Sequence, residues 1–161
     1  MQTRVVVVGA GPIGVLVAQE IRRRPSLELA AVVDVDPTKI GADVAGVRVQ
    51  ARLGDVDDAG VAVLTTSSSL AKLVPLALDV LARGMHVVST CEELAWPWSR
   101  EELARTLDDA ARHAGRVVLG TGVNPGFLIN TLPLFLTTPL NSIKHIHIKH
   151  IQNTSTHHKP F

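Results

Sequence analysis

Short runs of valine, leucine and other apolar residues alternate along this chain with longer stretches in which apolar residues recur every three or four positions. The short runs predict strands, and the longer stretches predict amphipathic helices. Strands are expected at residues 4–8, 29–33, 61–64, 85–88 and 117–119, and helices at residues 12–23, 70–83, 99–113 and 127–135. This alternation is typical of βαβ units, so we expect an α/β fold with a doubly wound parallel sheet.

Further details of the pattern concern the ends of these elements. Ser99 and Glu102 have the spacing of a capping box, and Gly115 stands where the same helix would end. Residues 143–151 alternate between apolar and polar side chains, which predicts one further strand. Residues 37–51 show no clear period and give no prediction.

The composition fits a folded domain with a core of its own. Of the 161 residues, 46% are apolar and 19% are charged, and the formal net charge is only +1, which excludes a disordered chain. The single cysteine, Cys91, cannot form an internal disulfide, so we expect a reducing, cytoplasmic location. Glycine, asparagine, threonine and proline interrupt the longest uncharged run, residues 117–143, so no membrane span is expected.

Charge is distributed unevenly between the two ends of the chain. All 15 acidic residues lie at or before Asp109, so residues 1–109 carry a formal charge of −4 and residues 110–161 carry +5. The bases at the basic end are scattered and no recognition motif accompanies them, so no nucleic-acid partner is expected. Five of the seven histidines lie in the last 17 residues without a cysteine or an acidic residue among them, and no metal site is predicted.

A glycine-rich turn follows the first predicted strand directly. Gly9, Gly11 and Gly14 form the pattern G-x-G-x-x-G, with Pro12 and Ile13 at the start of the next helix. In this context the first glycine permits a tight turn, the second lets the backbone approach a pyrophosphate, and the third lets the helix pack closely on the strand. The helix amides attract the anion. The motif predicts a dinucleotide site in a Rossmann-type domain; the alternative is a glycine turn that binds nothing.

Polar residues at the ends of two other strands complete this predicted cofactor site. Asp34 lies 20 residues after Gly14, where a carboxylate accepts hydrogen bonds from the adenosine ribose. Its charge repels a 2′-phosphate, which favours NAD, whereas a cation such as Lys39 would admit NADP. Thr66 and Ser67, in the hydroxylated run 65–69, are candidates to line the site, although simple helix capping is the alternative role.

Two further segments carry a more specific resemblance. They are residues 88–94 (VSTCEEL) and residues 120–127 (GTGVNPGF). Together with the glycine turn and the hydroxylated run, they resemble the N-terminal half of the 2,4-diaminopentanoate dehydrogenases and the related native amine dehydrogenases. The cofactor domain of that group is similar to the one in dihydrodipicolinate reductase. The resemblance runs over essentially the whole chain.

This resemblance implies a reaction and a division into domains. The reaction is oxidative deamination of a primary amine to a ketone and ammonia, or the reverse reductive amination, with NAD or NADP. Residues 1–140 would form the NAD(P)-binding domain, and residues 141–161 would begin a C-terminal α+β substrate domain that is otherwise missing. The partner would be a small amine or ketone, and the full-length form would be a homodimer.

The implied chemistry asks for a carboxylate near the reacting carbon, because the amine must lose a proton before a hydride leaves. Glu92 and Glu93 follow the strand at 85–88 and are the candidate catalytic residues. Glu92 is preferred because, by strand register, it is similar to the catalytic lysine position of homoserine dehydrogenases. Asn124 is a candidate to bind the substrate or the nicotinamide carboxamide, and ordinary turn chemistry is its alternative role.

Other functions stay open at this point. A domain of this kind can act as a non-catalytic NAD-binding module or sensor. It can also belong to a different oxidoreductase, of the dihydrodipicolinate reductase-like or homoserine dehydrogenase-like type.

Overall fold

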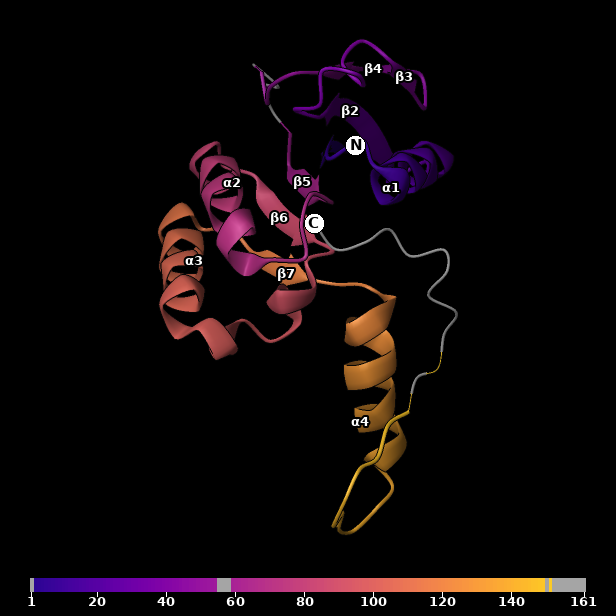
Figure 1. The fold of residues 1–161 in the computed structure, drawn as a ribbon, viewed down its shortest axis with the longest axis vertical. Helices are drawn as coiled ribbons and strands as arrows, with labels where there is room; N and C mark the ends of the chain where they lie inside the picture. The colour runs from indigo at the N-terminus through magenta and orange to yellow at the C-terminus, as the bar shows by residue number, and fades with distance from the viewer. Residues whose placement is uncertain (1, 55–58, 150, 152–161) are drawn as a thin grey trace.

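The computed structural model of the protein describes residues 2–54, 59–149 and 151. Within these residues a seven-stranded sheet forms the centre of the molecule, with the strand order β3-β4-β2-β1-β5-β6-β7 (Figure 1). The strands are β1 (Thr3–Val8), β2 (Leu27–Val33), β3 (Asp43–Val44), β4 (Val47–Gln50), β5 (Val61–Leu64), β6 (His86–Ser89) and β7 (Val118–Gly120). Neighbouring strands are parallel except β3 and β4, which pair antiparallel. The predicted doubly wound parallel sheet is therefore confirmed.

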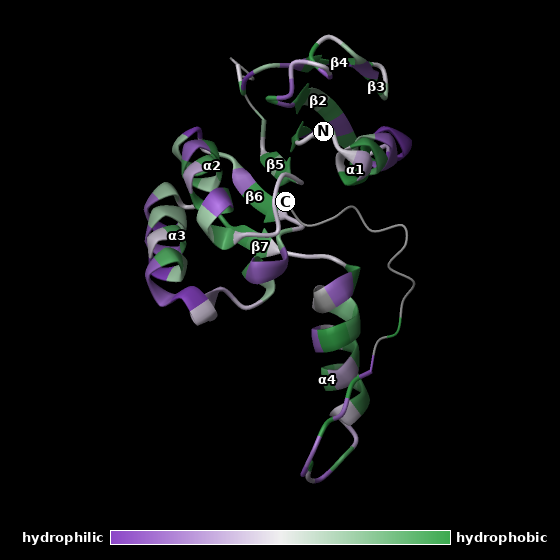
Figure 2. Cartoon of the chain, viewed as in Figure 1, coloured by the Kyte–Doolittle hydropathy of each residue, from purple (hydrophilic) through white to green (hydrophobic). Residues whose placement is uncertain are grey.

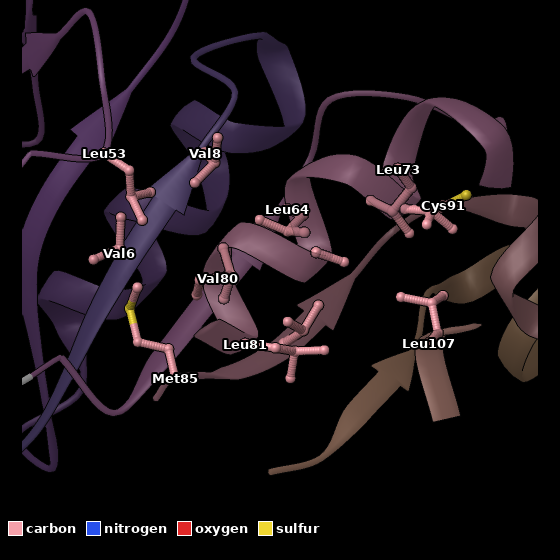
Figure 3. Close-up of a cluster of buried hydrophobic side chains, with 14 of the residues drawn as sticks. Val6, Val8, Leu53, Leu64, Leu73, Val80, Leu81, Met85, Cys91 and Leu107 are labelled. Carbon is pink, nitrogen blue, oxygen red and sulfur yellow. The ribbon is translucent and has the colours of Figure 1, made fainter. Parts of the chain in front are cut away.

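Helices cover both faces of this sheet. Helix α1 (Pro12–Arg23) lies on one face, and α2 (Leu70–Ala82) and α3 (Glu101–Ala114) lie side by side on the other (Figure 1). The valine run of β1 contributes to both faces, because Val6 and Val8 join the core under α2 and α3 while Val5 and Val7 join the core under α1. Figure 3 shows part of the larger core, where leucine and valine side chains of the sheet meet those of α2 and α3. A strand buried on both faces is what a continuous valine run predicts.

The order of the strands creates a switch point between β1 and β5. From β1 the chain adds β2 and β4 on one side, and it then returns to add β5, β6 and β7 on the other side. In open α/β sheets, ligands bind outside the carboxyl ends of the strands at such a switch point. The glycine turn after β1 and the hydroxylated run after β5 both lie there.

Two predicted helix ends have different outcomes. The capping box is wrong: Ser99 lies within the 3-10 turn η2 (Pro97–Arg100), and α3 begins at Glu101 without a side-chain cap. The Ser99 hydroxyl donates instead to the carbonyl oxygen of Trp96, at 3.1 Å, a local bond that competes with capping. Gly115 does end α3, with a positive φ of 61°.

The C-terminal part departs most from the prediction. The predicted helix at 127–135 is present as a longer helical segment, η3 (Val123–Thr131) continuing into α4 (Leu132–Thr137). The strand predicted at 143–151 is wrong for its described part, because residues 143–149 are exposed and form no strand. No described strand lies beside them to supply hydrogen bonds. Residues 37–51, which gave no prediction, contain the β3-β4 hairpin.

Helix α4 projects from the body of the molecule with its apolar side chains uncovered. Figure 2 shows hydrophobic residues along this helix, and Leu134, Phe135 and Leu136 are each more than 60% exposed. In the part of the chain that the structure describes, none of the helices has the length and apolar character needed to cross a bilayer.

Candidate functional site at the carboxyl ends of the strands

The glycine turn between β1 and α1 is closed on its inner side and open on its outer side. Gly9 has a φ of 104°, and a Cβ built on Gly14 would lie 1.7 Å from the carbonyl oxygen of Gly9. A Cβ on Gly11, in contrast, would meet nothing within 4 Å. The turn therefore leaves an uncovered backbone surface at the start of α1, where helix amides lack intrahelical partners and attract anions.

Asp34 stands directly after β2 and is bonded to this turn. Its Oδ2 accepts a hydrogen bond from the amide of Ala10 at 2.7 Å, and its Oδ1 accepts one from the amide of Asp36 at 2.9 Å. The Nζ of Lys39 lies 3.1 Å from Oδ2. Burial alone would raise the pKa of Asp34, but these hydrogen bonds together outweigh it and hold the pKa below its ordinary value. The side chain is therefore a carboxylate at neutral pH.

The residues of the hydroxylated run after β5 make different contacts. Thr65, which the sequence analysis did not single out, places Oγ1 2.9 Å from the carbonyl oxygen of Gly9 and 3.1 Å from that of Val8. It thus joins β5 to the glycine turn. Thr66 is exposed at the strand end, and the Ser67 hydroxyl accepts a hydrogen bond from the Ser69 amide at 3.1 Å. The signal for Thr65 was its place as the first polar residue after a buried strand.

A small pocket lies at the ends of β6 and β7. Glu92, the first residue of the 3-10 turn η1 (Glu92–Ala95), is exposed and lines this pocket together with Asn124. The other residues that line it are Thr90, Cys91, Ala95, Thr121, Gly122 and Gly126. Asn124 interrupts the helical backbone of η3 with an extended conformation, φ −140° and ψ 123°. The fold therefore brings together two of the predicted site residues, which are 32 positions apart in the sequence.

Glu93 is directed elsewhere. Its Oε2 accepts a hydrogen bond from the amide of Leu70, the first residue of α2, at 2.7 Å, and its Oε1 lies 3.6 Å from an Nη of Arg100. It is not among the residues that line the pocket. The structure thus separates the two glutamates, with Glu92 facing the pocket and Glu93 bound to the helix.

Metal-binding groups do not gather in the described part of the chain. No three histidine, cysteine or acidic side chains there are close enough to hold a metal ion. His145 and His147 are exposed in a segment without regular structure, and His150, His157 and His158 lie outside the described residues.

The residues at the switch point suit an adenine dinucleotide. The uncovered backbone at Gly11 leaves room for a pyrophosphate that a side chain would fill. The Asp34 carboxylate lies beside the same turn, as ribose hydroxyl recognition requires. Thr66, Glu92 and Asn124 continue the same edge of the sheet toward β7.

Comparisons with known proteins agree with this arrangement. The chain is similar to the 2,4-diaminopentanoate dehydrogenase of Acetoanaerobium sticklandii, with 28% identity over 84% of this chain and 42% of that protein. The amine dehydrogenase from Mycobacterium smegmatis has a similar structure, with a TM-score of 0.75, 25% identity, and coverage of 86% of this chain and 44% of that one. GenD2 from gentamicin A biosynthesis, solved in complex with NAD, matches with a TM-score of 0.59, 28% identity, and coverage of 74% and 34%.

These matches confirm the resemblance that the sequence suggested, and the chain spans less than half the length of each of these relatives. The model of the family described as "CoA binding domain" matches residues 1–87. These residues hold the glycine turn, Asp34 and the hydroxylated run. Because this match covers more than half of the chain, the protein belongs to the CoA binding domain family.

Proposed function

We propose that this chain is the NAD(P)-binding part of an oxidoreductase that acts on primary amines. The observation that carries the proposal is the placement of the open glycine turn, the Asp34 carboxylate beside it and the pocket glutamate Glu92 along one edge of the sheet. Similarity to a 2,4-diaminopentanoate dehydrogenase and to an amine dehydrogenase, each over more than four fifths of the chain, supports it.

The proposed cofactor site uses the residues at the switch point. The backbone from Gly9 to Gly14 would hold the pyrophosphate, Asp34 would accept hydrogen bonds from the ribose, and Thr66 and Ser67 would border the nicotinamide side. Asp34 also discriminates among adenine nucleotides, because NADP and coenzyme A both carry a phosphate on this ribose and NAD does not. We therefore expect NAD to be the preferred ligand.

The proposed reaction places proton transfer on Glu92. When bound, a nicotinamide would accept the hydrogen and electron pair that leave the amine carbon. Glu92 would take a proton from the ammonium group beforehand, so that the nitrogen lone pair is free to form the C=N bond. Once Glu92 has passed this proton to the water that reaches the pocket, its restored negative charge would stabilise the cationic iminium until water adds and ammonia leaves. Asn124, which also lines the pocket, would orient the substrate or the carboxamide of the cofactor.

We propose the domain boundary that the sequence suggested, with residues 1–140 as the NAD(P)-binding domain and residues 141–161 as the start of a substrate domain. Glu92 and Asn124, which line the pocket, are exposed in this structure, so water reaches the pocket. Efficient hydride transfer requires a held geometry and a site from which water is excluded. We therefore expect cofactor binding by the 161-residue chain, and efficient amine turnover only when a substrate domain covers the pocket.

Calorimetric titration tests the cofactor assignment. The 161-residue chain is titrated with NADH, NADPH and coenzyme A under identical conditions. Tightest binding of NADH is expected, and tighter binding of coenzyme A would contradict the assignment of Asp34.

NADH formation tests the reaction. A panel of short-chain amines is assayed at alkaline pH with NAD and with two proteins, the 161-residue chain and a longer protein that adds a substrate domain. Turnover is expected from the longer protein and is expected to be lost in Glu92→Gln. Retained turnover in Glu92→Gln would exclude Glu92 as the base, and efficient turnover by the 161-residue chain would refute the proposed need for a second domain.

A further inference from the structure

Hydrogen bonds join the end of β6 and the segment after it to neighbouring elements. Thr90, Cys91 and Glu92 line the pocket, and Ser89, Cys91 and Glu93 hydrogen-bond to the end of β5, to the loop before α2 and to the first residue of α2. The buried Ser89 hydroxyl donates to the carbonyl oxygen of Leu64 at 3.0 Å and accepts from the Cys91 amide at 3.1 Å. The end of β6 and the segment after it are thus bonded to neighbouring elements through Ser89, Thr90, Cys91 and Glu93.

Two of these bonds converge on one carbonyl group. The Cys91 thiol donates to the carbonyl oxygen of Ser68 at 3.1 Å, and the amide of Glu93 donates to the same oxygen at 3.3 Å. Glu92 stands between them. Both chain neighbours of Glu92 are therefore bonded to Ser68, and these bonds restrain the backbone on either side of Glu92.

The Glu93 side chain adds the strongest contact of this set. Ser69, the N-cap residue of α2, makes no side-chain cap, and the Leu70 amide donates instead to the Glu93 carboxylate at 2.7 Å. A charged acceptor at a helix N-terminus is favourable, because it satisfies an unpaired amide and faces the positive end of the helix dipole. Glu93 therefore caps a helix that begins 23 residues before it and fixes η1 to that helix.

We propose that Glu93 is a positioning residue that holds Glu92 toward the pocket. The inference rests on the proposed function, because it gives Glu92 the role of base. A carboxylate already bonded to the Leu70 amide and close to Arg100 is engaged in structure and is turned from the pocket. The two neighbouring glutamates thus have separate roles, one in holding the backbone and one in proton transfer.

Hydrogen exchange on the 161-residue chain tests whether the bond between Glu93 and the Leu70 amide holds the η1 segment against α2. In Glu93→Ala, the amides of Leu70 and of residues 91–93 should exchange about tenfold faster than in the wild type, as loss of a helix cap predicts. Glu93→Gln should stay close to the wild type, because its amide oxygen still accepts the bond. Arg100→Ala is the matched control and should change nothing, since it removes only an exposed ion pair. Unaltered exchange in Glu93→Ala would show that Glu93 does not hold this segment.

Amine binding tests the positioning role. n-Butylamine is titrated into the NADH complex of each variant and followed by NADH fluorescence. Glu93→Ala should weaken the amine about tenfold and leave NADH affinity unchanged, Glu93→Gln should restore amine affinity, and Glu92→Gln should lose it without faster exchange.

The outcomes distinguish failure of the positioning role of Glu93 from failure of the proposed function. Faster exchange in Glu93→Ala with unchanged amine affinity would make Glu93 a helix cap only and overturn the positioning role. A wild type that binds neither NADH nor n-butylamine would contradict the proposed function and with it the role assigned to Glu92. Exchange at residues 91–93 would even then decide whether Glu93 holds the segment.

Discussion

Gly11 and Gly14 belong to one motif but meet different surroundings. Nothing lies within 4 Å of a Cβ at Gly11, whereas a Cβ at Gly14 would lie 1.7 Å from the carbonyl oxygen of Gly9. Gly11→Val should therefore keep the thermal midpoint of unfolding but lose measurable NADH binding. Gly14→Ala should lower the free energy of unfolding by about 1–3 kcal/mol, as overpacking does.

Calorimetry and thermal unfolding on both variants check this difference. Equal NADH affinity in Gly11→Val and in the wild type would exclude the glycine turn as the pyrophosphate site.

Asp34 and Lys39 should set the preference between NAD and NADP in opposite directions. The Asp34 carboxylate, 3.1 Å from the Lys39 ammonium, raises the pKa of Lys39 and keeps it charged. Asp34→Ala should narrow the preference for NADH over NADPH by about 1–3 kcal/mol, through lost ribose hydrogen bonds and lost repulsion. Lys39→Ala should widen it. Competitive titration of the two cofactors measures both changes, and a wild type that prefers NADPH would show that Asp34 does not face the ribose.

Acid should weaken the fold partly through Asp34. Its pKa is lowered in the folded state, so its contribution to stability is present above the unfolded value of about 3.9 and is lost as the pH falls through the folded value. Asp34→Asn should be less stable than the wild type at pH 7, and the difference should shrink below about pH 4. Urea unfolding at a series of pH values checks this. A difference that does not change with pH would mean that Asp34 is not held as a carboxylate.

At the scale of single elements, the end of α3 offers a test of backbone conformation alone. Gly115 has a φ of 61°, and a Cβ there would meet nothing within 4 Å. Gly115→Ala should therefore lower the free energy of unfolding by about 1 kcal/mol through the left-handed backbone only. Gly115→Asn should be less destabilising, because asparagine tolerates this conformation better. Denaturant unfolding compares the three proteins, and an alanine variant as stable as the wild type would exclude this origin.

Elements with a strong local pattern were predictable from the sequence, and those that depend on distant partners were not. The valine run of β1 and the period of α1 are local properties, and both elements lie within one residue of their predicted bounds. The start of α3 was wrong because the Ser99 hydroxyl finds a nearer acceptor. Residues 143–149 have the alternation of a strand but no described neighbour to pair with, and pairing makes a strand.

In the candidate site, too, residues with a local sequence signal were predictable and residues that depend on distant partners were not. Gly11, Asp34 and Glu92 could be named from the sequence because each follows a recognisable strand. That Glu93 caps α2 could not, because the cap joins residues 23 positions apart through the fold. Thr65 was missed for the same reason: its bond to the carbonyl oxygen of Gly9 exists only after β1 and β5 have paired.

At the scale of the whole molecule, the sheet collects four short segments that are weak signals alone. The glycine turn, Asp34, the hydroxylated run and the η1 segment follow β1, β2, β5 and β6, whose carboxyl ends share one edge. Parallel pairing forces this convergence, because every crossover returns the chain to the same starting side. The grouping of these four segments is therefore a consequence of the sheet topology, and loss of one strand pairing would separate them.

The thiol of Cys91 lies at the carboxyl ends of the strands, and its reactivity can report how often the segment that carries it detaches from the sheet. The side chain is 3% exposed, and burial raises the pKa of the thiol, so little thiolate exists in the closed state. Iodoacetamide should therefore react only after the segment carrying Cys91 detaches, and the alkylation rate measures how often that happens. If opening also releases the cofactor, NADH at 100 times its Kd should slow alkylation about a hundredfold. An alkylation rate that does not respond to saturating NADH would show that the thiol is exposed by a motion that leaves the cofactor in place.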